Sequence, residues 1–174
     1  MNTKTIILVR HGQATHNLES IPWEEREQIR DPLLTPLGIE QAKQALIHRY
    51  SPSLIAVSPL QRTVQTCLYA LHSNGEMEQK CCATNLQMTK CIATRFGNTK
   101  VVLQPLLQEE NAGTLLCDTG VDVAELCEIY GNELFNLDYM CQESNCWYNP
   151  KHNLEERVKL LIQWLRDRER NVLL

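Results

Sequence analysis

The sequence lacks the features that would assign it to several broad classes of protein. It contains no run of about 18 apolar residues, so we expect no membrane span. Its N-terminus shows no charged and then apolar leader, and we therefore expect no secretory signal and a cytoplasmic location. The formal net charge of −4 argues against non-specific binding to nucleic acid.

Metal-binding patterns are also missing, although the chain has eight cysteines. No C-x-x-C pair occurs, and Cys141 and Cys146 have neither a partner pair nor histidines at ligand spacing. We therefore expect no metal ion and no cofactor. Without a secretory leader the thiols should be reduced, and Cys67 should pack as a small apolar residue on a helix.

Strands and helices alternate along the chain. We expect strands at 5–10, 54–57, 101–104 and 172–174, and helices near 23–29, 36–50, 59–72, 78–94 and 121–131. The buried stripe of a last helix is predicted to be Leu154, Val158, Leu161, Ile162 and Leu165. Its charged residues, among them Arg157, are expected on the exposed face. The alternation predicts a three-layer α/β sandwich with a mostly parallel central sheet, in one domain over residues 1–174.

The segment from Ile6 to Asn17 reads I-I-L-V-R-H-G-Q-A-T-H-N and carries the strongest functional signal. A short apolar strand ends at Arg10, His11 and Gly12. An imidazole and a guanidinium at the C-terminal end of a parallel strand suit a phosphoryl group, because ligands of open α/β sheets bind outside those strand ends. Gly12 lets the backbone approach an anion closely.

Three further segments follow in order. The first, D-P-L-L-T-P-L-G-I-E-Q-A, begins at Asp31; Thr35 is a good helix N-cap, and the proline after it suits the first helical position. The second, S-P-L-Q-R-T-V-Q-T, begins at Ser58, which we expect to cap a helix with Arg62 in its first turn. A helix N-terminus favours anions, and a guanidinium adds a fork for two oxygens. The third ends in the acidic pair Glu109–Glu110.

Together these segments resemble the histidine phosphatase superfamily, also called phosphoglycerate mutase-like, through its motifs R-H-G, D-x-x-L-T-x-x-G-x-x-Q-A, S-P-x-x-R-x-x-x-T and P-x-L-x-E. The resemblance implies that His11 is the nucleophile and becomes phosphorylated. It also implies that Arg10, Asn17 and Arg62 hold the phosphoryl oxygens. The family's general acid corresponds to Glu109, with Glu110 as the alternative one residue further on.

The end of the sequence departs from the family pattern. In the family the strand that matches 172–174 continues into a V-x-H-G turn, which carries a second catalytic histidine. His48, His72 and His152 lie in the wrong parts of the chain to replace it. We therefore expect a fold that is truncated at its C-terminus; a truncated gene product, an incomplete gene model and a true minimal homologue all fit. Loss of one preorganised donor typically costs on the order of 10²–10³ in rate.

The resemblance implies a metal-independent phosphomonoester hydrolase, which acts through a phosphohistidine on a small phosphorylated metabolite. A phosphoglycerate mutase is the alternative within the class, ranked lower because Q-E-E-N-A at 108–112 differs from the N-E-R-x-Y run of those mutases. A non-catalytic pseudoenzyme is the third hypothesis, because the second histidine has no counterpart. The expected partner is a small phosphomonoester, and the sequence does not indicate whether the chain is a monomer or an oligomer.

Overall fold

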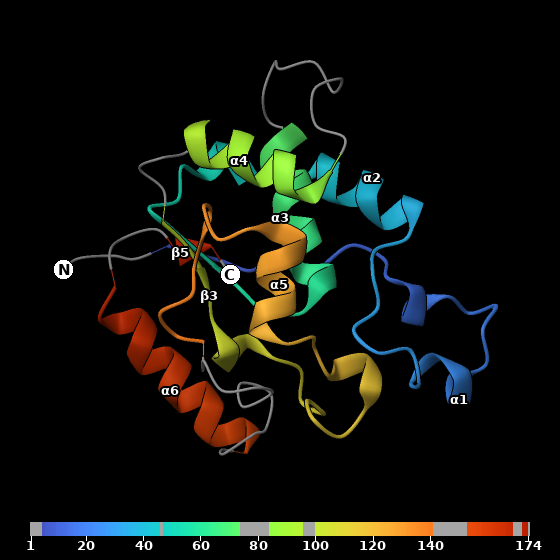
Figure 1. Cartoon of the computed structure of the whole chain (residues 1–174). Coiled ribbons are helices and arrows are strands. Elements are labelled where there is room, and N and C mark those ends of the chain that lie inside the picture. The colour runs from blue at the N-terminus through green and yellow to red at the C-terminus, as the bar shows by residue number, and fades with distance from the viewer. Residues whose placement is uncertain are drawn as a thin grey trace.

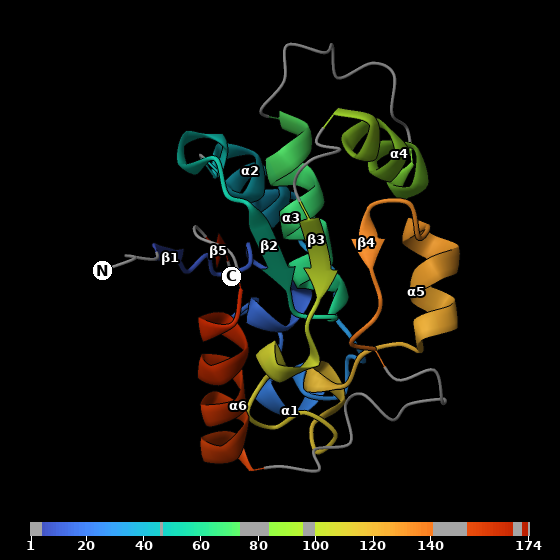
Figure 2. The same cartoon turned by 90° about the vertical axis from the view of Figure 1, so that its left-hand side faces the viewer.

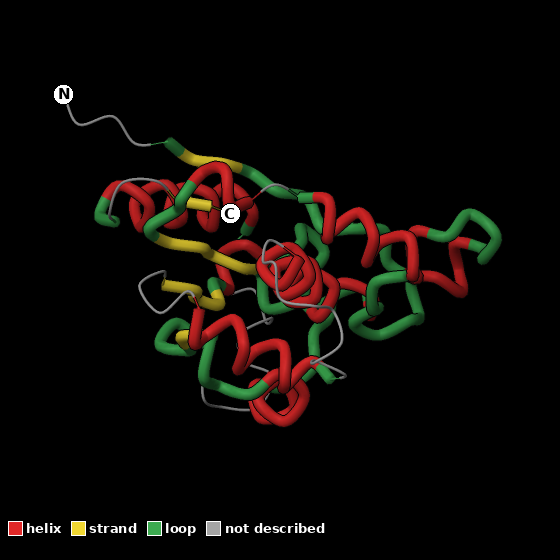
Figure 3. Tube along the Cα trace, turned by 90° about the horizontal axis from the view of Figure 1, so that it is seen from above, coloured by secondary structure: helices red, strands yellow, loops and turns green. Residues whose placement is uncertain are grey.

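The computed structural model describes residues 5–45, 47–73, 84–95, 100–140, 153–168 and 172–173. Its sheet contains β1 (Ile6–Ile7), β2 (Leu54–Val57), β3 (Lys100–Leu103), β4 (Phe135–Asn136) and β5 (Val172–Leu173). The spatial order is β1-β5-β2-β3-β4, and all neighbouring strands run parallel (Figure 2). Seen from above, the strands follow one another in a row (Figure 3). The predicted parallel sheet is confirmed, although β1 is shorter than the expected 5–10.

The helices are α1 (Trp23–Arg26), α2 (Pro36–Gln44), α3 (Gln61–Ser73), α4 (Asn85–Arg95), α5 (Val123–Tyr130) and α6 (Leu154–Arg166). The helix expected at 36–50 ends early, because Ala45 is extended and a short 3₁₀ turn follows at Ile47–Tyr50. Tyr50, at the end of this turn, is 51% exposed. None of the helices in the described part of the chain has the length and hydrophobicity that a membrane crossing requires.

Helices cover both faces of the sheet, so the molecule has three layers. Successive side chains of β2 point to opposite faces. Ile55 and Val57 join a core cluster with α3 and α5, whereas Leu54 and Ala56 pack against α6. Figure 1 shows α6 on its own, apart from α3 and α5. Both faces of β2 are therefore apolar, which is why this strand reads as a continuous apolar run in the sequence.

The buried face of α6 differs from the predicted stripe. Leu165 is buried and Leu161 is partly buried, but Leu154, Val158 and Ile162 are each at least 44% exposed. Arg157, expected on the charged face, is 3% exposed. The prediction was wrong because it assumed that only apolar residues of this helix would be buried. The buried side of α6 also includes the guanidinium of Arg157, which has polar partners.

The start of α3 is capped by a different residue from the one predicted. α3 begins at Gln61, and the Ser58 side chain has no hydrogen-bond partner among the described residues. The buried carboxylate of Asp31 caps the helix instead: Oδ1 accepts the N–H of Gln61 at 2.9 Å. Thr35, in contrast, caps α2 as predicted, since its hydroxyl accepts the N–H of Gly38.

Two glycines allow α2 to pack against the segment after β1. A Cβ atom added to Gly12 would collide with the backbone of Gly38, and one added to Gly38 would collide with the backbone of Gln13. The Gln41 side chain accepts the N–H of Gln13 at 2.8 Å, which fixes the same contact. The Gly12 and Gly38 motifs therefore pack closely against each other through their backbones. The N–H of Gly12 also donates to Thr66 of α3, so His11 lies beside that helix.

Candidate active site

His11 lies directly after β1, and its hydrogen bond defines its tautomer. Nδ1 is 2.7 Å from the carbonyl oxygen of Gly12. Because a carbonyl can only accept, Nδ1 carries the proton and the neutral ring keeps a lone pair on Nε2. Burial, and then the charge of Arg62, lowers the pKa of His11 below its usual 6.5. The imidazole is therefore neutral at pH 7 and able to act as a nucleophile.

Arg62 sits next to this backbone and is fully buried. The carbonyl of Arg62 accepts from the Thr66 hydroxyl, which in turn accepts the N–H of Gly12 at 3.1 Å. The guanidinium donates to the carbonyl of Cys117 at 2.6 Å and to Asp118 at 3.1 Å. It also lies 3.3 Å from a carboxylate oxygen of Glu109. The predicted anion-binding arginine and the predicted acid thus come together from segments 47 residues apart.

Glu109 is held from behind by α6. Nη1 of Arg157 donates to the carbonyl of Gln108 at 2.9 Å, and Nη2 donates to the carbonyl of Glu109 at 3.0 Å. Both acidic residues are exposed, but Glu109 lines the cavity beside His11 and Glu110 does not.

Arg10 and Asn17 have different surroundings. Arg10 lines the cavity beside His11 and remains exposed to solvent. The side-chain oxygen of Asn17 accepts the N–H of Ala14 at 2.9 Å, and its amide nitrogen lies 3.2 Å from Nε2 of His16. Asn17 thus shapes the loop after His11 and has one amide proton left for an oxygen of a ligand.

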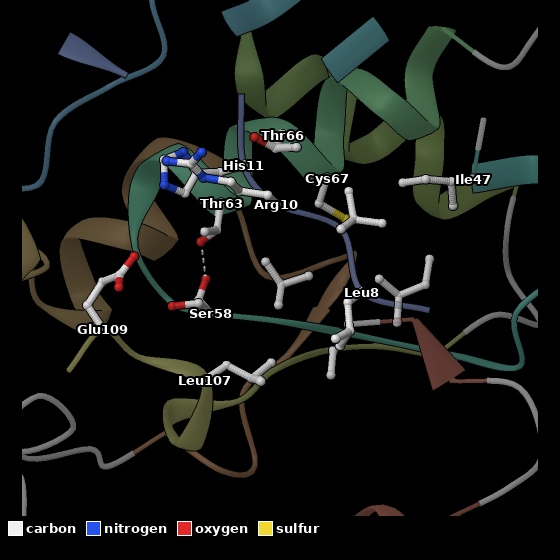
Figure 4. Close-up of a pocket in the computed structure, with 14 residues that line it drawn as sticks. Leu8, Arg10, His11, Ile47, Ser58, Thr63, Thr66, Cys67, Leu107 and Glu109 are labelled. Atoms are coloured by element: carbon white, nitrogen blue, oxygen red, sulfur yellow. Dashed lines mark hydrogen bonds between the residues drawn. The ribbon is translucent and has the colours of Figure 1, made fainter. Parts of the chain in front are cut away.

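A cavity of about 360 Å³ opens beside these groups. Figure 4 shows one end lined by the polar side chains of Arg10, His11, Ser58, Thr63, Thr66 and Glu109, and the other by Leu8, Ile47 and Cys67. The apolar end lies between Leu8–Val9 and Ile55–Val57. Among the described residues, β5 lies between β1 and β2 and pairs with both at Val172 and Leu173.

Cys67 lines this cavity as a free, buried thiol, as its predicted apolar role requires. Burial raises its pKa to about 12, so it stays protonated. Among the described residues no group of three histidine, cysteine, aspartate or glutamate side chains could hold a metal ion. Cys81, Cys82, Cys141 and Cys146 lie outside the described residues, as does His152.

Sequence reasoning missed four residues that shape the site: Asp31, His16, Asp118 and Arg157. Asp31 joins two segments, because Oδ1 binds the start of α3 and Oδ2 accepts the N–H of Val121 at 3.0 Å. His16 lies 6.0 Å from His11 between ring centres. A second histidine five residues after His11 was a visible signal in the sequence, whereas no local pattern around Asp118 or Arg157 predicts their long-range partners.

Comparison with known proteins agrees with this geometry. The family model of the histidine phosphatase superfamily (branch 1) matches residues 6–81. A phosphoglycerate mutase-like protein of Arabidopsis thaliana is 28% identical over 178 residues, which cover 93% of this chain and 66% of the relative. Phosphoglycerate mutase-like protein 2 of the same plant is 37% identical over 81 residues, 41% of this chain and 24% of the relative. The chain thus spans 66% of the length of the first relative and 24% of the second, less than two thirds in each case.

A solved structure shows the same fold. A candidate alpha-ribazole-5'-P phosphatase from Escherichia coli superposes with a TM-score of 0.50 at 21% sequence identity. The match covers 97% of this chain and 71% of the other. Residues 6–81 thus match the histidine phosphatase superfamily, and the fold of the chain is the three-layer α/β arrangement with a parallel sheet.

Proposed function

We propose that this site takes a phosphoryl group from a small phosphomonoester onto Nε2 of His11 and then passes it to water. The observation that carries the proposal is the fixed tautomer of His11. Its Nδ1–H is bonded to the Gly12 carbonyl, so the Nε2 lone pair faces a substrate without a proton to remove first. A covalent intermediate of this kind divides one difficult displacement into two easier ones.

Unsatisfied polar atoms support an anion site at the same place. Nε of Arg62 and Oγ of Ser58 are buried without a hydrogen-bond partner among the described residues. A buried donor without a partner costs about 1–3 kcal/mol, which a phosphoryl oxygen would recover. Arg62 and Arg10 supply the positive charge that the transferring group needs.

Glu109 is proposed as the general acid. Its carboxyl lines the cavity and contacts Arg62. In the first step it would give a proton to the departing alkoxide, and in the second it would take one from water. The backbone contacts from Arg157 keep this turn in place during both steps.

The alternatives are phosphoglycerate mutase-type transfer and phosphate binding without turnover. The names of the Arabidopsis relatives are compatible with the mutase alternative. Assay with an aryl phosphate and with 3-phosphoglycerate separates the three, using wild type and His11→Ala. We expect hydrolysis that depends on His11. Mutase turnover above hydrolysis would favour mutase-type transfer. Binding of inorganic phosphate without either reaction would favour phosphate binding without turnover.

A further inference from the structure

His16 lies in the same electrostatic environment as the proposed nucleophile. It belongs to the 3₁₀ turn Thr15–Asn17, and its ring lies 6.0 Å from that of His11, tilted by 43°. Burial, and then the charges of Arg62 and His11, lowers the pKa of His16 from 6.5 to about 4. The ring is therefore uncharged at pH 7 and can bind an oxygen only through a neutral N–H group.

The hydrogen bonds of Asn17 determine which nitrogen of His16 carries that proton. The backbone N–H of Ala14 donates to Oδ1 of Asn17, which identifies the oxygen end of the amide. The amide nitrogen therefore faces Nε2 of His16 at 3.2 Å and must be the donor. Nε2 accepts this hydrogen bond, so the proton of the neutral ring is on Nδ1.

This Nδ1–H group is buried and has no hydrogen-bond partner among the described residues. A buried donor left without an acceptor is unfavourable, so such a group beside His11 indicates a place for a ligand acceptor. The nearest ring is the proposed phosphoryl acceptor. A phosphoryl group on His11 with a hydrogen bond of about 2.8 Å fits within a ring separation of 6.0 Å.

We propose that His16 is a further ligand of the phosphoryl group, with its Nδ1–H donating to one phosphoryl oxygen. This inference rests on the proposed function and adds a donor that the family motifs do not assign. Asn17 then has a second role besides contacting the ligand, because it holds the His16 tautomer that makes the donor available. The step moves no proton and breaks no bond; it only stabilises charge on the oxygen.

The test is the dissociation constant of inorganic phosphate, measured by calorimetry on the whole chain. His16→Leu should weaken binding roughly tenfold to a hundredfold, as expected for a hydrogen bond to a charged group. His16→Asn places an amide N–H near the position of Nδ1 and should retain most of the affinity. His16→Gln places its amide near the position of Nε2 instead and should bind as weakly as His16→Leu. His72→Leu, on the far end of α3, is the matched control and should bind like wild type.

Two outcomes separate this inference from the proposed function. If His16→Asn and His16→Gln bind phosphate equally, the Nδ1 donor has no role and the inference is wrong, even where His16→Leu fails to fold. Weaker phosphate binding by Arg62→Lys, measured alongside, would show that Arg62 contributes to the phosphate site even where the His16 inference is wrong. If Arg62→Lys and His11→Ala both bind phosphate like wild type, the proposed function fails as well.

Discussion

The two sides of the site are held together by different kinds of contact. On the side of His11 and Arg62, neighbouring motifs lock onto each other through glycine contacts and the Gly12–Thr66–Arg62 chain of hydrogen bonds. On the acidic side, Glu109 sits in a turn whose backbone is held by Arg157 of α6. The first side resists change because its contacts are buried and made largely through the backbone. The second is a turn with its own backbone hydrogen bonds, to which α6 adds two donors from one long side chain.

The largest effect should follow from removing the nucleophile on the first side. His11→Ala leaves no group to accept the phosphoryl, and we expect kcat to fall by at least about a thousandfold on every substrate. Thermal unfolding should change little, because the ring is only partly buried. Steady-state kinetics with an aryl phosphate checks this. Residual activity within tenfold of wild type would show that another group attacks.

Loss of the guanidinium fork should rank second. Arg62→Ala would break a buried charge pair from one side, which costs about 3–5 kcal/mol, so a folded variant is not expected. Arg62→Lys retains the charge and loses the fork. We expect kcat/KM to fall by on the order of 10². An unchanged kcat/KM in Arg62→Lys would place the transferring oxygens elsewhere.

Changes on the acidic side should depend on the leaving group. Glu109→Gln keeps the shape and removes the proton, so it should slow alkyl phosphates by about 10²-fold or more. Nitrophenyl phosphate, whose leaving group needs no proton, should lose far less. Glu110→Gln is the matched control and should leave both substrates unaffected. Equal losses of activity on both substrates in Glu109→Gln would exclude Glu109 as the general acid. A loss confined to alkyl phosphates in Glu110→Gln would assign the general acid to Glu110.

Replacing Arg157 should also slow alkyl phosphates more than nitrophenyl phosphate, but by a smaller factor than Glu109→Gln. Arg157→Met keeps the apolar stem and removes the two donors to the Gln108 and Glu109 carbonyls. We expect roughly tenfold slower alkyl phosphate turnover, unchanged phosphate binding and a small loss on nitrophenyl phosphate. Lys159→Met, which changes a 70% exposed side chain of the same helix, serves as the control. A uniform loss on both substrates would mean that Arg157 acts only on stability.

Asp31 connects the start of α3 to Val121, and its effect should be visible in the pH dependence of stability. Burial raises its pKa from 3.8 to about 6 in the folded chain. Because the folded state holds this proton more tightly, the Asp31 contribution to the free energy of unfolding is present below pH 3.8 and is lost as pH rises through about 6. Urea unfolding across this window should show wild type losing stability relative to Asp31→Asn as pH rises. Parallel curves would contradict the assignment.

The sequence predicted the first side of the site far better than the second. The cap at Thr35 and Arg62 in the first turn of α3 are local or motif-based features that the sequence spacing predicted, whereas the contact between Gly12 and Gly38 was not predicted. Ser58 was wrongly expected to cap α3 because Asp31, which does so, lies 30 residues earlier in the chain. Arg157 was wrongly placed on the exposed face, since its partners are backbone carbonyls that no side-chain pattern reveals.

The most direct test of the account is the identity of the phosphorylated atom. The whole chain is mixed with an aryl phosphate, quenched under alkaline conditions and digested for mass spectrometry. The account predicts one acid-labile phosphoryl group on His11, absent in His11→Ala and present in Glu109→Gln and His16→Asn. A phosphoryl group on another residue, or turnover of the aryl phosphate without any phosphorylated His11, would contradict the account.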